Sequence, residues 1–182
     1  TGRAFACEHA GIVPDIICLG KALSGGYITL AATVCHQAVA DGISQGSVPA
    51  LMHGPTYMAN PLACAVAAAS LRLFQQGHWQ QQVASIEQIL QQRLLPLCQQ
   101  PQVADCRVLG AIGVVELVDK IDVAKAQALM VERGVWIRPF GNLLYLMPPY
   151  IIQPHELHQL CDVVCWIVNQ DIRYQGTVLP GA

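Results

Sequence analysis

The chain has 182 residues, of which 53% are hydrophobic and 12% are charged, about half of the roughly 25% charge of an average globular domain. This composition excludes an intrinsically disordered chain, and 10 basic against 12 acidic residues without a basic cluster predict no nucleic-acid partner. The longest apolar stretch, residues 61–71, is shorter than the roughly 20 residues of a membrane-spanning helix, so we expect no membrane partner.

Two strand-like runs around a glycine-rich turn are expected near the start of the chain. Residues 15–19 form a short apolar run, typical of a strand that is buried on both faces. Residues 27–34 are rich in β-branched and aromatic side chains, which favour a second strand. The turn between the strands spans residues 20–26 and contains Lys21.

Helices are expected in the next part of the chain. Residues 36–46 predict a short helix, and residues 47–61 predict a loop because of their prolines and glycines. Asn60 stands directly before a proline, a combination that favours a helix start. The helix over residues 62–76 is apolar nearly all round, so we expect it to be buried. A further helix over residues 79–99 carries apolar residues at helical spacing and glutamines on its other face.

A change in composition near Pro101 predicts a compact α+β unit in the second half of the chain. Gly134 is expected to end a helix as its C-cap. In chain order, the expected elements are strands over 103–118, a helix over 123–133, strands over 135–139 and 143–147, and a helix over 154–171.

The eight cysteines are mostly single residues in apolar runs, the usage of small buried hydrophobic residues rather than of a disulfide framework. Together with the absence of a signal-peptide pattern, this predicts a cytoplasmic protein. His155, His158, Cys161 and Cys165 resemble a set of metal ligands, but on one helix they span roughly 15 Å of rise. They cannot all reach one tetrahedral zinc ion, so we expect no metal site and predict that both cysteines face the core.

Lys21 is the candidate for covalent chemistry. The other two lysines, Lys120 and Lys125, lie in a charged stretch typical of a surface. Lys21 lies between an apolar strand and a glycine-rich turn, where a buried ammonium group is costly unless it is paired or deprotonated. Lysines desolvated in this way act as amine nucleophiles and form Schiff bases, and a strand-end lysine that reaches solvent is the alternative. A P-loop is excluded because alanine follows the lysine.

The loop at residues 54–56 has the sequence Gly-Pro-Thr and lies shortly before the helix that starts after Asn60. Free backbone N–H groups and one hydroxyl are typical of a phosphate-binding loop. The same three residues are also common in an ordinary turn, so both interpretations remain open.

Arg138 interrupts an otherwise apolar strand-like run. Trp136 and Phe140 point to the same side as Arg138 if the run is extended, because side chains alternate along a strand. An arginine in this setting forms either an ion pair within the domain or a bidentate contact with a ligand carboxylate. The sequence alone supports both.

Four segments together resemble a known family. In chain order they are residues 15–26, 52–64, 134–141 and 144–150. With their order and spacing they resemble the class III aminotransferases, pyridoxal-phosphate (PLP) enzymes of fold type I. The segments Trp-Ile-Arg-Pro-Phe-Gly and Tyr-Leu-Met-Pro-Pro-Tyr narrow the resemblance to the adenosylmethionine-8-amino-7-oxononanoate aminotransferases of biotin synthesis.

The resemblance implies a role for each candidate residue. Lys21 would form a Schiff base with pyridoxal 5′-phosphate and move a proton as general base and acid. Thr56, with the backbone of Pro55, would bind the cofactor phosphate of a neighbouring subunit, so a homodimer with a shared active site is implied. The implied substrate-binding residues are Gly54, Arg138 and Tyr145. The implied reaction moves an amino group from S-adenosylmethionine to 8-amino-7-oxononanoate and gives 7,8-diaminononanoate.

The resemblance also implies an α/β architecture. Residues 1–102 would be the C-terminal part of the large PLP-binding domain, with a mostly parallel sheet, and residues 103–182 a small C-terminal α+β domain. The chain would then be the C-terminal portion of the enzyme, with exposed strand edges and apolar surface in residues 1–60. Two alternatives stay open: a catalytically silent fragment of that enzyme, and another class III ω-aminotransferase.

Overall fold

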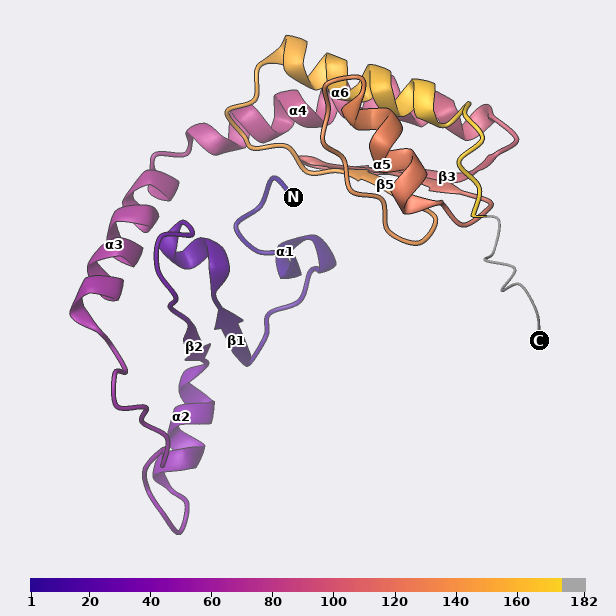
Figure 1. The fold of residues 1–182 in the computed structure, drawn as a ribbon. Helices are drawn as coiled ribbons and strands as arrows, with labels where there is room; N and C mark the ends of the chain where they lie inside the picture. The colour runs from indigo at the N-terminus through magenta and orange to yellow at the C-terminus, as the bar shows by residue number, and fades with distance from the viewer. Residues whose placement is uncertain (175–182) are drawn as a thin grey trace. The chain divides into compact units, whose positions relative to one another are not determined.

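The computed structural model describes residues 1–174, which form two compact units (Figure 1). The first unit consists of residues 3–78, and the second consists of residues 79 onward together with Thr1 and Gly2. The domain boundary that the resemblance implies at residue 102 concerns the domains of a longer enzyme and stays a prediction.

The first unit contains short elements around one long helix. In chain order they are α1 (Cys7–Ala10), β1 (Ile16–Leu19), the 3-10 turn η1 (Lys21–Ser24), β2 (Ala32–Cys35), α2 (Gln37–Ser44) and α3 (Pro61–Gln75). The expected strand at residues 27–34 is wrong in its bounds, because β2 starts only at Ala32. Residues 27–31 connect the glycine-rich turn to β2 and are not part of the pairing with β1.

β1 and β2 form an antiparallel pair, with Ile16 opposite Cys35 and Leu19 opposite Ala32. The mostly parallel pairing that we expected is therefore not seen among residues 1–174, where both sheets are antiparallel. β1 is also not buried on both faces, since Ile16 is 54% exposed. Apolar side chains of a strand are buried only where another layer covers them, and β2 is the only strand of the described chain that pairs with β1.

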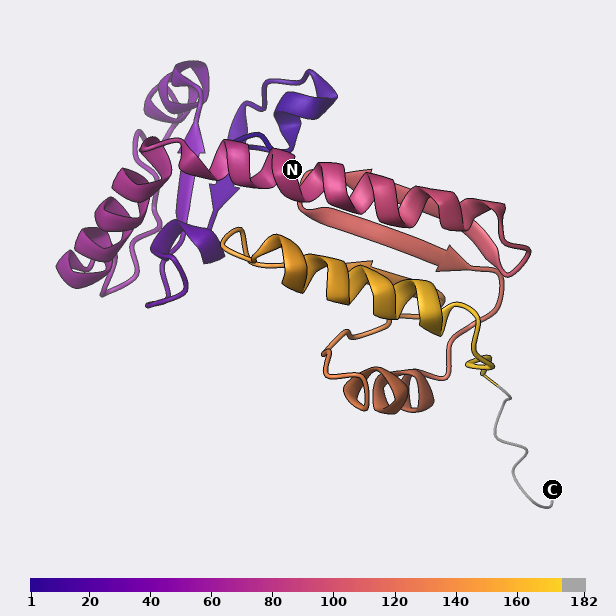
Figure 2. The ribbon, with the colours of Figure 1, turned by 90° about the horizontal axis from the view of Figure 1, so that it is seen from above.

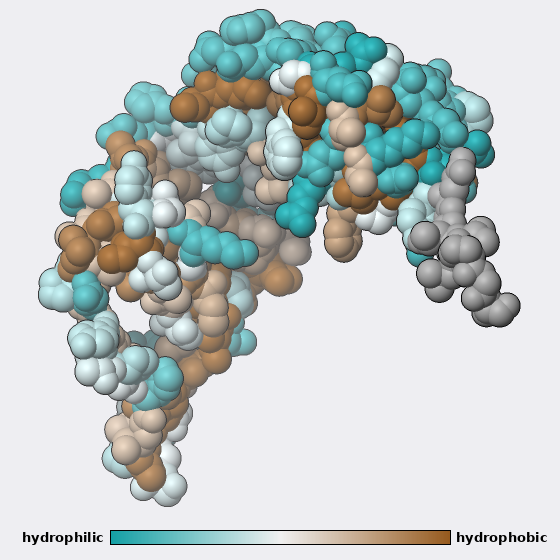
Figure 3. Space-filling model, in the orientation of Figure 1, coloured by the Kyte–Doolittle hydropathy of each residue, from teal (hydrophilic) through white to brown (hydrophobic). Residues whose placement is uncertain are grey.

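α3 starts where the sequence predicts, because the Asn60 side chain accepts a hydrogen bond from the Ala63 N–H at 3.2 Å. Only Ala63 and Ala67 of this helix are buried, so the expected burial all round is wrong. Leu62 is 64% exposed and Leu73 is 67% exposed. Figure 3 shows such apolar surface, in brown, over α3 and α2, and the apolar surface expected in residues 1–60 is present too.

The second unit is an antiparallel three-stranded sheet with helices. Its elements are α4 (His78–Leu94), the 3-10 turn η2 (Leu95–Gln99), β3 (Val103–Leu109), β4 (Ile112–Leu117), α5 (Val123–Val131), β5 (Leu143–Leu146) and α6 (Pro154–Ile167). The strand order is β3-β4-β5, and α4 and α6 lie side by side across one face of the sheet (Figure 2). None of the helices in residues 1–174 combines the length and the hydropathy needed to cross a bilayer.

The core of the second unit follows the predicted periodicity. Val83, Ile86, Leu90 and Leu94 of α4 are all buried. α4 approaches the sheet closely at Gly113, where a Cβ atom would lie 2.7 Å from Leu94 Cδ1. A side chain at this position would therefore push the helix away from β4.

Cys106 and Cys161 are buried in this core, and the partly buried Cys165 packs against it. The expected burial is wrong for four of the eight cysteines, which are exposed: Cys18, Cys35, Cys64 and Cys98. Burial raises the pKa of Cys161 to about 12. Burial, and then hydrogen bonding to the Cys98 thiol, raise the pKa of Cys106 to about 12. Both thiols are therefore protonated at neutral pH and pack as small apolar groups.

The segment 135–139, expected as a strand, forms no strand ladder. A single bridge joins Phe140 to Leu143, with N–H to carbonyl distances of 2.9 and 2.8 Å. Pro139 explains the difference in part, because it lacks the N–H group that a ladder requires.

Candidate functional site

Lys21 has an unusual backbone. It is the first residue of η1 and has a φ of +49°, in the left-handed region. Within residues 1–174 the only other residue besides glycine with a positive φ is Ala59. This conformation costs a side-chain-bearing residue of order 1–3 kcal/mol, and such strain is concentrated at functional sites. The conformation therefore singles out Lys21 independently of its side-chain chemistry.

Lys21 also lies at a pocket of the first unit. The pocket has a volume of about 380 Å³ and is lined by Lys21, Ser24, Gly26, Tyr27, Ile28, Thr29 and Leu30. The Lys21 side chain is exposed, so the sheltered ammonium group that we expected is wrong for this chain on its own. In the part of the chain that the structure describes, its amine has no hydrogen-bond or ion-pair partner. The site thus offers an unpaired primary amine beside a small pocket.

The loop at residues 54–56 is exposed and rich in unpaired donors. The carbonyl of Pro55 accepts the Met58 N–H at 2.9 Å, which closes a turn directly before α3. Among the described residues, the backbone N–H and the hydroxyl of Thr56 have no acceptor, and neither does the Gly54 N–H. Unpaired N–H and O–H donors of this kind suit a phosphate group.

Arg138 and Tyr145 lie on one face of a hairpin that turns at Gly141. The chain before the turn has Val135, Ile137 and Pro139 buried, and the chain after it has Leu144 and Leu146 buried. The residues between these positions face away from the core, and they include Arg138, which is exposed, and Tyr145, which is partly buried. Arg138 and Tyr145 therefore both lie on the side of their segments that faces away from the core residues.

The same outer face of the sheet contains a second arginine with a different environment. Arg107 lies opposite Val114, and Val114 lies opposite Tyr145. Asp105 and Glu116 neutralise Arg107, at 2.5 and 2.7 Å from its Nη1 atom. Arg138 has no such carboxylate anywhere in residues 1–174, so the ion pair that we kept as an alternative is not formed there. Its guanidinium group is therefore unpaired in the described chain.

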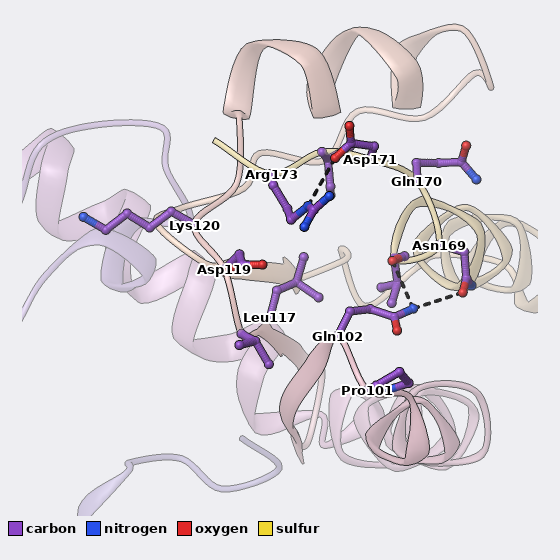
Figure 4. A pocket seen from close by; sticks show the side chains of 12 residues that line it. Pro101, Gln102, Leu117, Asp119, Lys120, Asn169, Gln170, Asp171 and Arg173 are labelled. Atoms are coloured by element: carbon purple, nitrogen blue, oxygen red, sulfur yellow. Dashed lines mark hydrogen bonds and ion pairs between the residues drawn. The ribbon is translucent and has the colours of Figure 1, made fainter. Parts of the chain in front are cut away.

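Another pocket, of about 500 Å³, lies in the second unit. Figure 4 shows that polar side chains surround it and bond to one another. Gln102 donates a hydrogen bond to Asn169 at 3.0 Å, and Arg173 pairs with Asp171 at 3.3 Å. None of the residues implicated by the sequence lines this pocket. Its walls come from separate chain segments with no shared sequence signal, so sequence reasoning could not find it.

The candidate residues are thus divided between the two units. Lys21 and the loop at residues 54–56 belong to the first unit, although that loop does not line the Lys21 pocket. Arg138 and Tyr145 belong to the second unit and share one face. Sequence reasoning missed Ser24, which is buried beside Lys21, because a serine in a glycine-rich segment looks like an ordinary turn residue.

Comparisons with known proteins give a consistent picture. The sequence model of the family described as aminotransferase class-III matches residues 1–168. An adenosylmethionine-8-amino-7-oxononanoate aminotransferase of Buchnera aphidicola (subspecies Acyrthosiphon pisum) is 54% identical over 170 residues, which are 93% of this chain and 40% of the relative. The chain therefore spans less than half of the length of this relative.

Solved structures are similar over nearly the whole chain. The crystal structure of an enzyme with the same name from Methanocaldococcus jannaschii matches with a TM-score of 0.80 and 30% identity, over 92% of this chain and 42% of that one. An amine transaminase from an uncultivated Pseudomonas species, solved in a PLP-bound form, matches with a TM-score of 0.81 and 29% identity, over 92% and 41% of the two chains.

Proposed function

Because the chain belongs to the class III aminotransferases, we propose that it carries the cofactor lysine, a phosphate-binding loop and a carboxylate-binding arginine of an aminotransferase acting on S-adenosylmethionine and 8-amino-7-oxononanoate. The product would be 7,8-diaminononanoate, in biotin synthesis. The observation that carries the proposal is the unpaired amine of Lys21 on a left-handed backbone beside a pocket. The cytoplasmic location, and the absence of membrane and nucleic-acid partners, stay predictions from the composition.

The donors in the first unit fit pyridoxal phosphate chemically. Lys21 offers a primary amine for the aldehyde of the cofactor, and Thr56 offers a hydroxyl and an N–H group for its phosphate. When bound, the cofactor supplies an electron sink for the negative charge that develops at the carbon bearing the amino group. The amine of Lys21, once released, accepts a proton at Nζ and returns it, as a general base and acid.

We further propose that the site is completed by a second copy of the chain. Thr56 and Pro55 would hold the cofactor phosphate of the partner subunit, and Gly54 would line the substrate pocket. The exposure of this loop supports the proposal, because Met52 and Tyr57 are each 83% exposed. Large apolar side chains exposed on a loop are typical of interfaces.

Arg138 would bind the carboxylate that both substrates carry, with Tyr145 beside it on the same face. A guanidinium group binds a carboxylate through two parallel hydrogen bonds. The absence of an internal partner in the described chain supports this role, since Arg138 would not have to break an ion pair first. Arg107, by contrast, is already paired with Asp105 and Glu116 and would have to break these ion pairs to bind a ligand.

Arg138→Lys is expected to raise the KM of both carboxylate-bearing substrates by about 10-fold to 100-fold. The variant keeps the positive charge but loses the bidentate geometry, and hydrogen bonds to charged groups contribute about 1.5–3 kcal/mol. Steady-state kinetics with each substrate varied in turn measures the effect. Arg107→Lys is the matched control and should leave both KM values unchanged. Equal effects of the two substitutions would contradict the assignment of Arg138.

Thr56→Val is expected to weaken cofactor binding by about 10-fold, because one hydrogen bond to a charged phosphate is lost at nearly constant side-chain volume. Equilibrium dialysis against PLP measures the dissociation constant. The matched control is Thr33→Val, which removes an exposed hydroxyl of β2 in the same unit. An unchanged dissociation constant for Thr56→Val would show that another group binds the phosphate.

The proposal is tested by locating the cofactor. The natural polypeptide that contains these residues is incubated with PLP, reduced with borohydride and mapped by mass spectrometry. A phosphopyridoxyl group is expected on Lys21 and not on Lys120 or Lys125. No adduct on Lys21 would overturn the proposal. Activity with a diamine or an ω-amino acid, but not with S-adenosylmethionine, would instead identify another class III ω-aminotransferase.

A further inference from the structure

Ser24 is the one polar or charged residue of the described chain that is buried, with an exposed fraction of 2%. It is the last residue of η1, three positions after Lys21. Burial of a hydroxyl is unfavourable unless it is hydrogen-bonded. A residue of this kind in a turn that begins with the candidate lysine calls for a physical explanation.

The Ser24 hydroxyl is bonded within the turn. It donates to the carbonyl of Ile28 in a short hydrogen bond, and the carbonyl of Lys21 lies 3.5 Å from the same oxygen. A hydroxyl has a single proton, so Ile28 is its main acceptor, and the contact with Lys21 is secondary. The hydroxyl thus contacts the carbonyls of Lys21 and Ile28, two residues that line the pocket.

Backbone hydrogen bonds close the rest of the turn around this hydroxyl. The Tyr27 N–H donates to the Ser24 carbonyl at 3.2 Å, and the Gly25 N–H donates to the Ala22 carbonyl at 3.0 Å. Ser70 of α3 donates to the same Ala22 carbonyl at 3.3 Å. The Ser24 hydroxyl thus adds a side-chain hydrogen bond, to the Ile28 carbonyl, to the backbone hydrogen bonds of this turn.

We propose that Ser24 is a positioning residue, whose hydroxyl fixes the turn so that Lys21 keeps its left-handed backbone and directs its amine into the pocket. The proposal rests on the proposed function of Lys21 and adds a residue to it. Without the hydroxyl, the strained φ of Lys21 relaxes toward the right-handed region that this residue type prefers. A change in the φ of Lys21 also displaces the Nζ atom at the end of its long side chain. The amine then no longer has the geometry that proton transfer requires.

Three substitutions separate hydrogen bonding from packing. Ser24→Ala removes the hydroxyl, Ser24→Cys keeps nearly the same volume with a weak donor, and Ser24→Thr keeps the hydroxyl. The matched control is Ser44→Ala, which removes another serine hydroxyl bonded to a backbone carbonyl, that of Ala40 at 3.0 Å, in the same unit. All variants are made in the natural polypeptide that contains these residues.

The expected result is a split between kinetic constants. In Ser24→Ala and Ser24→Cys, kcat falls by about 10-fold to 100-fold. KM for both substrates stays within about twofold, because their carboxylates bind at Arg138. Ser24→Thr retains the wild-type kcat, and so does Ser44→Ala. If Ser24→Cys behaves like the wild type, the side chain acts by packing alone and the proposal is overturned.

A second readout needs no cofactor. Hydrogen exchange of the amides of residues 23–27 is expected to be about tenfold faster in Ser24→Ala than in the wild type, because a lost buried hydrogen bond costs about that factor in the stability of the turn. Ser44→Ala should leave these amides unchanged. If Ser24→Thr does not fold, the comparison of alanine and cysteine with this control still decides the outcome.

Different results would overturn the proposed function and the proposed role of Ser24. A wild-type protein that forms no adduct on Lys21 overturns the proposed function, whatever the exchange rates are. A wild-type protein that forms the adduct, with kcat and exchange rates unaffected by Ser24→Ala, overturns only the role of Ser24.

Discussion

Lys21→Ala is expected to abolish the covalent attachment of pyridoxal phosphate and to lower the transamination rate by about 100-fold to 10,000-fold, the usual contribution of a positioned general acid and base. The substitution removes the one lysine amine of residues 3–78. Mass spectrometry after borohydride reduction measures the attachment, and the rate of 7,8-diaminononanoate formation measures the activity. Replacement by alanine removes no hydrogen bond or ion pair of the side chain in the described chain.

Lys125→Ala is the matched control, because this lysine is exposed on α5. It should leave both the attachment and the rate unchanged. A Lys21→Ala protein that still carries a phosphopyridoxyl group after reduction would contradict the assignment of the lysine. Added ammonia or a small alkylamine is expected to restore part of the rate, which distinguishes a missing proton carrier from a misfolded variant.

Leu90→Ala is expected to lower the free energy of unfolding of the second unit by about 3–5 kcal/mol. Leu90 has an exposed fraction of 0% and lies at the closest approach of α4 to the sheet, where its Cδ2 atom is 3.3 Å from the position of a Cβ on Gly113. Truncation leaves a cavity there, because the surrounding core is closely packed and relaxes only in part.

Urea denaturation followed by tryptophan fluorescence measures this effect, because all three tryptophans lie in the second unit: Trp79, Trp136 and Trp166. Leu95→Ala is the control, since this leucine is 42% exposed directly after α4. It should cost less than about 1 kcal/mol. Equal losses for the two leucines would mean that the core is not centred on α4.

Periodicity and capping residues predict most of the helices. α3 begins at Pro61 as the Asn60–proline pair indicates, and α4 has its predicted apolar positions in the core. These elements are decided by contacts between residues close in sequence. The α/β class and the membership in the class III aminotransferases follow from motifs at fixed spacings, which the family comparison confirms.

Burial could not be predicted in the same way. The apolar runs of β1 and α3 predict covered faces, yet Ile16 and Leu62 are more than half exposed. An apolar pattern reports which residues favour burial, and the neighbouring layer decides whether they achieve it. The missing ladder at residues 135–139 has a local cause, because Pro139 removes a donor that a pattern of alternating residues does not register.

The candidate site, too, was predicted only in part from the sequence. The sequence selected Lys21 as the candidate amine, but the sheltered setting expected for it is not found, and its left-handed backbone was not predicted, since lysine has no preference for positive φ. Arg138 and Tyr145 both face away from the core residues that alternate with them. The sequence alone does not reveal which side of each segment is covered, because that depends on packing.

The first unit has few buried residues, and this affects its stability in solution. Only Ser24, Ala63 and Ala67 are buried within residues 3–78, whereas the second unit has a continuous apolar core. A segment with so few buried residues depends on binding for its stability. A bound partner or ligand stabilises the folded segment by a free energy that grows with the logarithm of the free partner or ligand concentration. Under the proposed dimer, dilution and cofactor depletion would loosen the lysine-bearing segment first, while the helices over the three-stranded sheet stayed folded.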